Sequence, residues 1–341
     1  MTLAYQVFTK GFFIVLALTT LLFLAGIVVL PGYADQAEAQ SEPAGGEVPA
    51  VTHNTWTSGA AMPVALKAPM AGVIKTKVYV VGGVTHTAVV ANNQIYDLVA
   101  NTWSTGAALP TATFDGAAAV VKGILYIFGG SNDDGTTVTN AVWAYSPKTN
   151  TWTAKAAMPT ARDSAAAAVS KNIIYVIGGN GSGSLRLTTV ESYNPATNTW
   201  TEEAPLLVGR SEPSVGLVGT TIVATGGYTT SGVTGDTEGY NVSTNSWTSL
   251  ATEPTPTSAA CTGSAKGSLY IAGGFGGGGP IANTESFKGS KNKWTNDASM
   301  PQGLIWPGYA VYKNVLYCMG GGDNNNVFQG NVYGNVQIYQ P

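Results

Sequence analysis

Residues 173–179 read I-I-Y-V-I-G-G, and residues 190–200 read V-E-S-Y-N-P-A-T-N-T-W. Together the two runs form one copy of a unit that recurs along the chain. Paired glycines that close an apolar run occur six times, at spacings of 47, 49, 48, 47 and 47 residues, beginning at Gly82, Gly129, Gly178, Gly226, Gly273 and Gly320. A tryptophan two residues after an asparagine keeps the same spacings, at Trp56, Trp103, Trp152, Trp200, Trp247 and Trp294. Two independent markers with one period indicate internal structural repeats.

Turn signals divide each copy into four predicted strands. In the quoted copy these are an Ala-rich run at residues 164–169, the apolar run at 173–177, residues 190–193, and a strand around Trp200. Small residues in the first strand suit a crowded centre where sheets converge. The bulky tryptophans and tyrosines suit the widening space between neighbouring sheets.

The glycine pair, the N-x-W run and a tyrosine three residues before the glycines form a pattern with a period of about 50 residues that resembles the kelch repeat. Val223 replaces that tyrosine in the fourth copy, Phe287 replaces a later tyrosine in the fifth, and residues 322–333 form a long loop in the last. The resemblance implies an all-β, six-bladed kelch-type β-propeller over residues 51–341, which we expect to be monomeric.

The two ends of the repeat region complement each other. The sixth copy stops at Tyr339-Gln340-Pro341, before any N-x-W strand, whereas the first copy is preceded by Asn54-Thr55-Trp56 without a glycine pair. We therefore expect residues 51–60 to form the outer strand of the last blade. Such a strand would satisfy an otherwise open sheet edge.

Composition narrows the class of partner. The chain has 341 residues, 43 of them glycine, with 10% charged residues and a formal net charge of −3. A nucleic-acid ligand is not expected, because phosphate-binding surfaces need clustered Lys and Arg. The two cysteines, Cys261 and Cys318, fall in predicted strands; buried free thiols are favoured over a disulfide. No cofactor or metal is expected.

The N-terminal segment differs from the repeats. Lys10 precedes an apolar run at residues 11–30, and Ala37-Glu38-Ala39 follows as a small-x-small site. Residues 1–39 are therefore predicted to be either a cleaved signal peptide or a retained transmembrane anchor. Residues 40–50 read as a flexible linker. Both alternatives predict an extracytoplasmic protein (secreted, periplasmic or on the cell surface), and residues 11–30 could attach it to a membrane.

Candidate ligand-binding residues come from loops that share one face of a propeller. About 15 residues before each glycine pair, at the expected mouth of the channel, stand Lys67, Phe114, Arg162, Arg210, Ser258 and Trp306. Guanidinium groups suit carboxylate or phosphate, and aromatic faces suit sugar rings. The alternative is a structural role in which Arg162 pairs with Asp163 and Arg210 with Glu212.

Loops between the second and third strands add the candidates His86, Arg186, Tyr228 and Phe275. Asp133, Asp134 and Asp323 also lie in such loops, where turn chemistry is favoured over a calcium site. One acidic residue recurs at the same position of the third strand, as Glu191, Glu238 and Glu285, and this repetition predicts a structural role.

The favoured function is a non-catalytic module that binds a carbohydrate or a protein partner through its loop face. Copper chemistry of the galactose oxidase type is not expected, because the chain has only two histidines, His53 and His86. The first alternative is a sugar epimerase or mutarotase. The exported sialic acid mutarotases are kelch propellers, and by analogy Arg162 and Arg210 would hold a carboxylate while Glu212 or His86 moves protons. The second alternative is a structural or adhesive surface protein.

Overall fold

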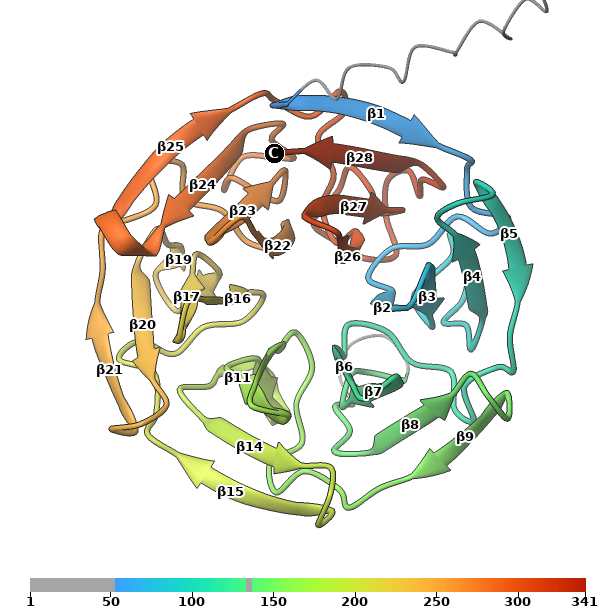
Figure 1. The fold of residues 1–341 in the computed structure, drawn as a ribbon, viewed down its shortest axis with the longest axis horizontal. Coiled ribbons are helices and arrows are strands. Elements are labelled where there is room, and N and C mark those ends of the chain that lie inside the picture. The colour runs from blue at the N-terminus through green and yellow to red at the C-terminus, as the bar shows by residue number, and fades with distance from the viewer. Residues whose placement is uncertain (1–52, 133–136) are drawn as a thin grey trace, which may run out of the picture. The chain divides into compact units, whose positions relative to one another are not determined.

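The computed structural model describes residues 53–132 and 137–341, which form six four-stranded antiparallel sheets around a common centre (Figure 1). This is the all-β six-bladed propeller that the repeats predict. The helical segments of the described residues are two short 3₁₀ turns, Ser182–Ser184 (η1) and Gly289–Lys291 (η2). No helix in these residues is long and apolar enough to cross a membrane. The predicted leader and linker, with the predicted N-terminal helix, lie outside the described residues.

Each sheet is a blade whose strands follow one another from the centre outward. The first blade comprises β2 (Met70–Ile74), β3 (Lys77–Val81), β4 (Asn93–Asp97) and β5 (Thr102–Thr105). The second comprises β6 (Ala117–Val121), β7 (Ile124–Phe128), β8 (Val142–Ser146) and β9 (Thr151–Ala154). The third comprises β10 (Ala166–Ser170), β11 (Ile173–Ile177), β14 (Val190–Asn194) and β15 (Thr199–Glu203).

The remaining blades follow the same order. The fourth comprises β16 (Ser214–Val218), β17 (Thr221–Thr225), β20 (Thr237–Asn241) and β21 (Ser246–Ser249). The fifth comprises β22 (Cys261–Ala265), β23 (Ser268–Ala272), β24 (Thr284–Lys288) and β25 (Lys293–Asp297). The sixth comprises β26 (Gly308–Tyr312), β27 (Val315–Met319), β28 (Val336–Gln340) and β1 (Thr55–Gly59). Two small hairpins, β12 (Asn180–Gly181) with β13 (Leu185–Arg186) and β18 (Tyr228–Thr229) with β19 (Gly232–Val233), extend loops between second and third strands.

The predicted strands of the third blade agree with the structure to within one residue, except at the start of the first strand. That strand begins at Ala166 and not at residue 164. Ser164 has a φ of 52°, in the left-handed region, so it cannot continue an extended strand. The chain therefore turns at this residue before it enters the sheet.

The N-x-W run links each blade to the blade before it. In every copy the tryptophan Nε1 donates a hydrogen bond to the carbonyl oxygen of an alanine in the preceding blade's loop, at 2.7–2.9 Å. The asparagine Oδ1 accepts from a backbone N–H of the same loop, at 2.6–2.9 Å. All six asparagines have φ between 45° and 57°, a left-handed conformation that asparagine tolerates better than most residues. The motif is thus an inter-blade contact.

The glycine pair makes a second inter-blade contact. The N–H of the second glycine donates to a backbone carbonyl of the following blade, as from Gly83 to Thr113 at 2.8 Å and from Gly130 to Arg162 at 2.9 Å. A Cβ on Gly82 would lie 2.2 Å from the Thr113 oxygen, and its φ is +64°. Both the close approach and the left-handed backbone therefore require glycine at this position.

The strand at the N-terminal end of the ring lies beside the last strand of the chain. β1 pairs with β28 in antiparallel register, with Trp56 opposite Tyr339 and Thr57 opposite Ile338. The two rings of the first pair have centroids 5.0 Å apart. Figure 1 shows β1 as the outer strand of the sheet formed by β26, β27 and β28. The sixth sheet thereby has the same four-stranded form as the others.

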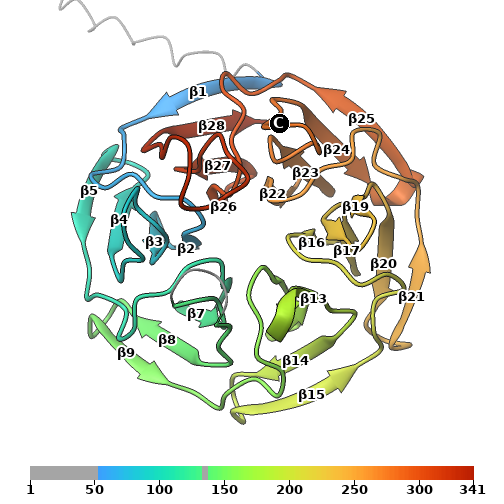
Figure 2. The same cartoon turned by 180° about the vertical axis from the view of Figure 1, so that it is seen from behind.

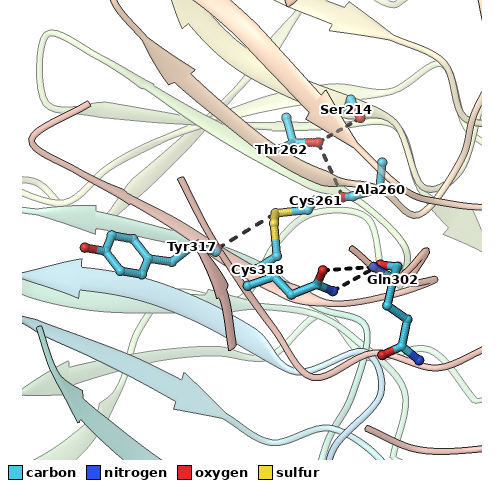
Figure 3. Close-up of a disulfide and its surroundings, with 8 residues drawn as sticks. Ser214, Ala260, Cys261, Thr262, Gln302, Tyr317 and Cys318 are labelled. Atoms are coloured by element: carbon cyan, nitrogen blue, oxygen red, sulfur yellow. Dashed lines mark hydrogen bonds between the residues drawn. A yellow bond between two sulfur atoms is a disulfide. The ribbon is translucent and has the colours of Figure 1, made fainter. Parts of the chain in front are cut away.

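The prediction of free thiols is wrong, because Cys261 and Cys318 form a disulfide (Figure 3). Cys261 lies on the first strand of the fifth blade and Cys318 on the second strand of the sixth. Inner strands of neighbouring blades converge toward the centre, which brings the two Cα atoms within 5.7 Å. The sequence places each cysteine on a strand but does not say which strands face each other across a blade interface.

Replacing both cysteines by alanine should lower the free energy of unfolding by roughly 2–4 kcal/mol, because the disulfide closes a 57-residue loop and thereby restricts the unfolded chain. Denaturant unfolding of the double variant and of the wild type, without reductant, measures the difference. Wild-type protein unfolded with a reductant should approach the variant. Equal stability of the oxidised wild type and the variant would show that the bond does not contribute.

Candidate functional site

A closed belt of backbone hydrogen bonds surrounds the centre of the propeller. It joins the six residues that stand 14 positions before each glycine pair: Ala68, Asp115, Ser164, Glu212, Ala259 and Trp306. The N–H of each residue donates to the carbonyl oxygen of its counterpart in the preceding blade, at 2.7–3.2 Å, and Ala68 completes the circle by donating to Trp306. We call these six residues the channel belt.

Every belt residue has a left-handed backbone, with φ between 47° and 57°. None of them is glycine, so each costs on the order of 1 kcal/mol relative to an extended residue. Six such residues persist because the surrounding ring fixes them. This conformation turns the side chains toward the central channel, and all six line one cavity of about 70 Å³.

The belt side chains provide two polar pairs. Ser164 Oγ donates to Asp115 Oδ2 at 2.5 Å, and Trp306 Nε1 donates to Glu212 Oε1 at 3.0 Å. The other two members are alanines, which leave space between the pairs. The belt therefore presents two carboxyl groups and one indole ring in a narrow opening.

Burial and mutual repulsion weaken the acidity of these carboxyl groups. Desolvation in the channel raises the pKa of Asp115 well above its ordinary value, and the charges of Asp163 and Glu212 raise it further. Desolvation likewise raises the pKa of Glu212, while the bond from Trp306 opposes that shift. Below the belt, desolvation and the charge of Asp115 raise the pKa of Tyr309 to about 12. The mouth thus holds carboxyl groups that can change protonation above the usual acidic range.

Loops between second and third strands form a rim that shares two cavities with the belt residues. Figure 2 views the propeller from the side on which one of these loops carries β13. A cavity of about 230 Å³ is lined by belt residues Glu212 and Trp306 together with rim residues Asn180, Arg186, Tyr228, Phe275 and others. The β12–β13 hairpin holds Arg186, whose guanidinium lies 5.2 Å from the centre of the Tyr228 ring and donates to Asn180 Oδ1. The rim therefore adds a cation, amides and aromatic faces to the carboxyl groups below it.

Asp163 supplies a third carboxyl group at the mouth. Its side chain is buried, and desolvation raises its pKa. Its Oδ1 has no hydrogen-bond partner among the described residues. It lines a second rim cavity, of about 610 Å³, with Phe114, Asp115, Trp306 and residues 325–329. A buried acceptor without a partner, next to open space, is suited to a donor group from a ligand.

Four of the predicted site residues line the cavity of about 230 Å³ at this mouth: Trp306, Arg186, Tyr228 and Phe275. Phe114 is also there, but it is buried and packs edge-on against Phe328 with centroids 5.9 Å apart. Ser258 is buried and pairs with Phe275 in a β-bridge. His86 is exposed in its loop and lines neither rim cavity.

The three cations predicted at the channel mouth lie inside the protein. Arg162 is fully buried, with Nη2 2.8 Å from Glu191 Oε2, and Arg210 forms the equivalent ion pair with Glu238. Both guanidinium groups also donate to backbone carbonyls of their own blade. Lys67 is buried too, and its Nζ donates to the Asn326 and Gln329 carbonyls, which supports the loop of the last blade.

These contacts confirm the structural role predicted for Glu191 and Glu238, and Glu285 accepts a hydrogen bond from Thr255 Oγ1 at 2.6 Å. The arginine partners are Glu191 and Glu238 and not the adjacent Asp163 and Glu212. As a result, Asp163 and Glu212 remain available at the mouth.

Sequence reasoning missed Asp115 altogether and treated Asp163 only as an ion-pair partner. A signal was present, because a fixed count of 14 residues before each glycine pair selects all six belt positions. The approximate count of 15 residues before each glycine pair instead selects one of three neighbouring positions in different copies. Side chains at these neighbouring positions point in different directions. Asp133 and Asp134 lie outside the described residues. Asp323 accepts from Asn331 and Tyr333 within its own loop, and no cluster of metal-ligating residues occurs in the described part of the chain.

Comparisons with known proteins agree with this architecture. A family model described as the Attractin/LZTR1 β-propeller matches residues 78–276, more than half of the chain. The solved structure of YjhT is similar with a TM-score of 0.70 and 20% sequence identity, over 81% of this chain and 95% of that chain. At this identity the likeness shows the fold alone. None of the curated proteins matches the sequence significantly.

Asp115→Asn should make the protein more stable than the wild type at neutral pH, with a difference that grows as the pH rises. In the wild type the raised pKa favours the neutral carboxyl in the folded state, so stability is lost as the pH rises from about the ordinary value of 3.8 through the folded-state pKa. The asparagine does not ionise. Denaturant unfolding between pH 4 and pH 8 measures both proteins.

Asp97→Asn is the control with the opposite sign. The backbone amide of Ala100 and the ammonium of Lys77 lower the pKa of Asp97 to about 2, so this carboxylate stabilises the fold above its ordinary pKa. The Asp97 variant should therefore be less stable than the wild type at neutral pH and approach it as the pH falls. A pH-independent difference for Asp115→Asn would contradict the proposed origin of the shift.

Proposed function

This chain belongs to the Attractin/LZTR1 β-propeller family, and we propose that it is an exported, non-catalytic binding module of the kelch type whose channel mouth binds a carbohydrate. The observation that carries the proposal is the placement of the Trp306 indole beside three carboxyl groups in connected cavities. A sugar presents apolar C–H faces and hydroxyl donors on the same ring. The indole can pack against the C–H faces, and the carboxyl groups can accept hydrogen bonds from the hydroxyl groups.

Hydrogen-bonding capacity supports a polyhydroxylated ligand. Carboxylates accept hydrogen bonds from neighbouring hydroxyl groups, and Asp163 Oδ1 is a buried acceptor without a partner among the described residues. Asn180 lines both rim cavities and can donate as well as accept. Of the three arginines in the chain, Arg186 is the one that lines the mouth, where it could pair with a carboxylate on an acidic sugar.

The shape of the mouth favours a small ligand over a protein surface. The lining residues form concave cavities of about 70 and 230 Å³, with a wider one of about 610 Å³ beneath the last loop. Small-molecule sites are concave with a few placed polar groups, whereas protein interfaces are broader and flatter. A protein partner, or a purely adhesive role, would use the outer loops and leave the belt residues unused.

Two observations support export. The apolar run at residues 11–30 has the composition of a signal or anchor segment. The Cys261–Cys318 disulfide is a bond that persists in oxidising compartments and is rare in the cytosol. A secreted, periplasmic or surface location is consistent with both.

The raised carboxyl pKa values favour one second candidate, a sugar epimerase or mutarotase. General acid–base catalysis requires groups that exchange protons near neutral pH, and burial raises the pKa of both Asp115 and Glu212. In that case Glu212 would be a proton-transfer group and Arg186, not Arg162 or Arg210, would hold an acidic substituent. Binding alone needs none of these proton transfers.

A glycan array with the full protein, followed by calorimetric titration of the best ligand, tests the mouth site. Trp306→Ala should weaken binding by about tenfold or more, as expected for truncation of a central aromatic contact. Glu212→Gln should also weaken it, because the amide replaces one acceptor oxygen by a donor. The matched control is Glu202→Gln, which makes the same change at an exposed position on the outer strand β15 and should leave the affinity unchanged.

The outcomes separate the candidates. If the Trp306 and Glu212 variants bind the ligand with full affinity, the binding site does not lie at the channel mouth. Loss confined to acidic sugars in Arg186→Gln would identify the substituent that the rim recognises. NMR spectra would show faster exchange between sugar anomers if the protein is a mutarotase. That function would be supported over a binding module if wild type and the Glu202 variant accelerate the exchange and Glu212→Gln does not.

A further inference from the structure

Pairs of tyrosines fill the space between successive blades. In each pair one tyrosine comes from a second strand and the other from the third strand of the next blade. The ring centroids are 5.4 Å apart for Tyr79–Tyr145, 5.9 Å for Tyr126–Tyr193, 5.8 Å for Tyr175–Tyr240 and 5.8 Å for Tyr270–Tyr339. Tyr317 and Tyr96 lie in one core cluster at a fifth interface. A tyrosine ring is therefore the usual occupant of this space.

The interface between the fourth and fifth blades lacks such a pair. Val223 stands where the second strand of every other blade has tyrosine, and Phe287 stands opposite it in β24. Both side chains are buried, yet both line an open cavity of about 490 Å³. The two departures from the repeat therefore fall at the same place, and Val223 supplies no ring where the other blades have a tyrosine.

The cavity is mainly apolar and lies on the face of the propeller opposite the channel mouth. Val218, Val223, Leu250 and Phe287 form its apolar walls. Its rim is formed by turns between first and second strands, at Gly219 and Gly267, and by the turn after β24, at Gly289 and Ser290. In an antiparallel blade these turns lie at the other end from the loops that build the mouth, so the two sites do not overlap.

One cation stands at the rim of this cavity. Lys288 lines it, and its Nζ donates to the carbonyl oxygen of Lys266 at 3.2 Å. Among the residues that the structure describes, no carboxylate lies within 4.0 Å of that Nζ. The ammonium group is therefore free to pair with an anion at the edge of an apolar hollow.

We propose that this inter-blade cavity binds a small aromatic carboxylate. The planar ring takes the space that a tyrosine ring takes at the other interfaces and packs against Phe287, with Val223 as the floor. The carboxylate reaches the rim and pairs with Lys288. Neither the channel belt nor any sugar takes part, so this site is independent of the function proposed for the mouth.

Titration of the full protein with 4-hydroxyphenylacetate, followed by ligand-observed NMR, tests the site. This compound combines the tyrosine side-chain ring with a carboxylate. Wild-type protein should bind it saturably, and Val223→Tyr should abolish binding because the new ring occupies the cavity. The melting temperature of Val223→Tyr should not fall below that of the wild type, because the substitution restores the arrangement of the other interfaces.

Lys288→Gln keeps the proposal testable if Val223→Tyr does not fold. It should weaken binding of the acid by roughly twofold to fivefold, the range expected for one solvent-exposed ion pair, and the neutral analogue p-cresol should bind equally to wild type and to this variant. Lys293→Gln, a matched change at an exposed position on β25, should have no effect. Undiminished binding to a folded Val223→Tyr, or no saturable binding to the wild type, would overturn the proposal.

Discussion

The closed belt of six backbone hydrogen bonds is the constraint on which the rest of the propeller depends. Each bond runs from one blade to the next, so the circle requires all six blades at once. The N-x-W contacts at the outside and the glycine-pair contacts also join each blade to its neighbour. Together these three sets hold six residues with left-handed backbones around the channel, at positions where the side chain is free to vary. Function can therefore change at the belt without a change in the scaffold.

Most of the fold could be predicted from the sequence because its determinants repeat. The glycine pair and the N-x-W run mark contacts that every blade must make, and their period alone gives the number of blades. Strand positions followed from the turns, apart from the start of β10, where Ser164 belongs to the belt and not to the sheet. The disulfide could not be predicted, because it depends on the packing of two inner strands whose separation in the sequence carries no signal.

The candidate site was predicted only in part, for a reason of side-chain direction. Trp306 and the rim residues Arg186, Tyr228 and Phe275 were found because they depart from the repeat in loops. Arg162 and Arg210 stand only two residues before the belt, but they point into their blades and neutralise Glu191 and Glu238. Charge alone therefore selected residues that are buried inside their blades. Asp115, which lies at the mouth, was overlooked, and Asp163 was considered only as an ion-pair partner. Positions that depart from the repeat and lie together in the structure, at the belt or at Val223 and Phe287, indicate a candidate site better than charge does.

Amide hydrogen exchange of the six belt residues tests most directly whether the belt holds the mouth as one preformed unit. Each belt N–H is bonded within a closed circle, so no single bond can open without disturbing its neighbours. All six amides should exchange slowly and at similar rates, set by unfolding of the whole propeller. Rapid exchange at Asp115, Glu212 or Trp306, with the strands of the same blades still protected, would contradict it.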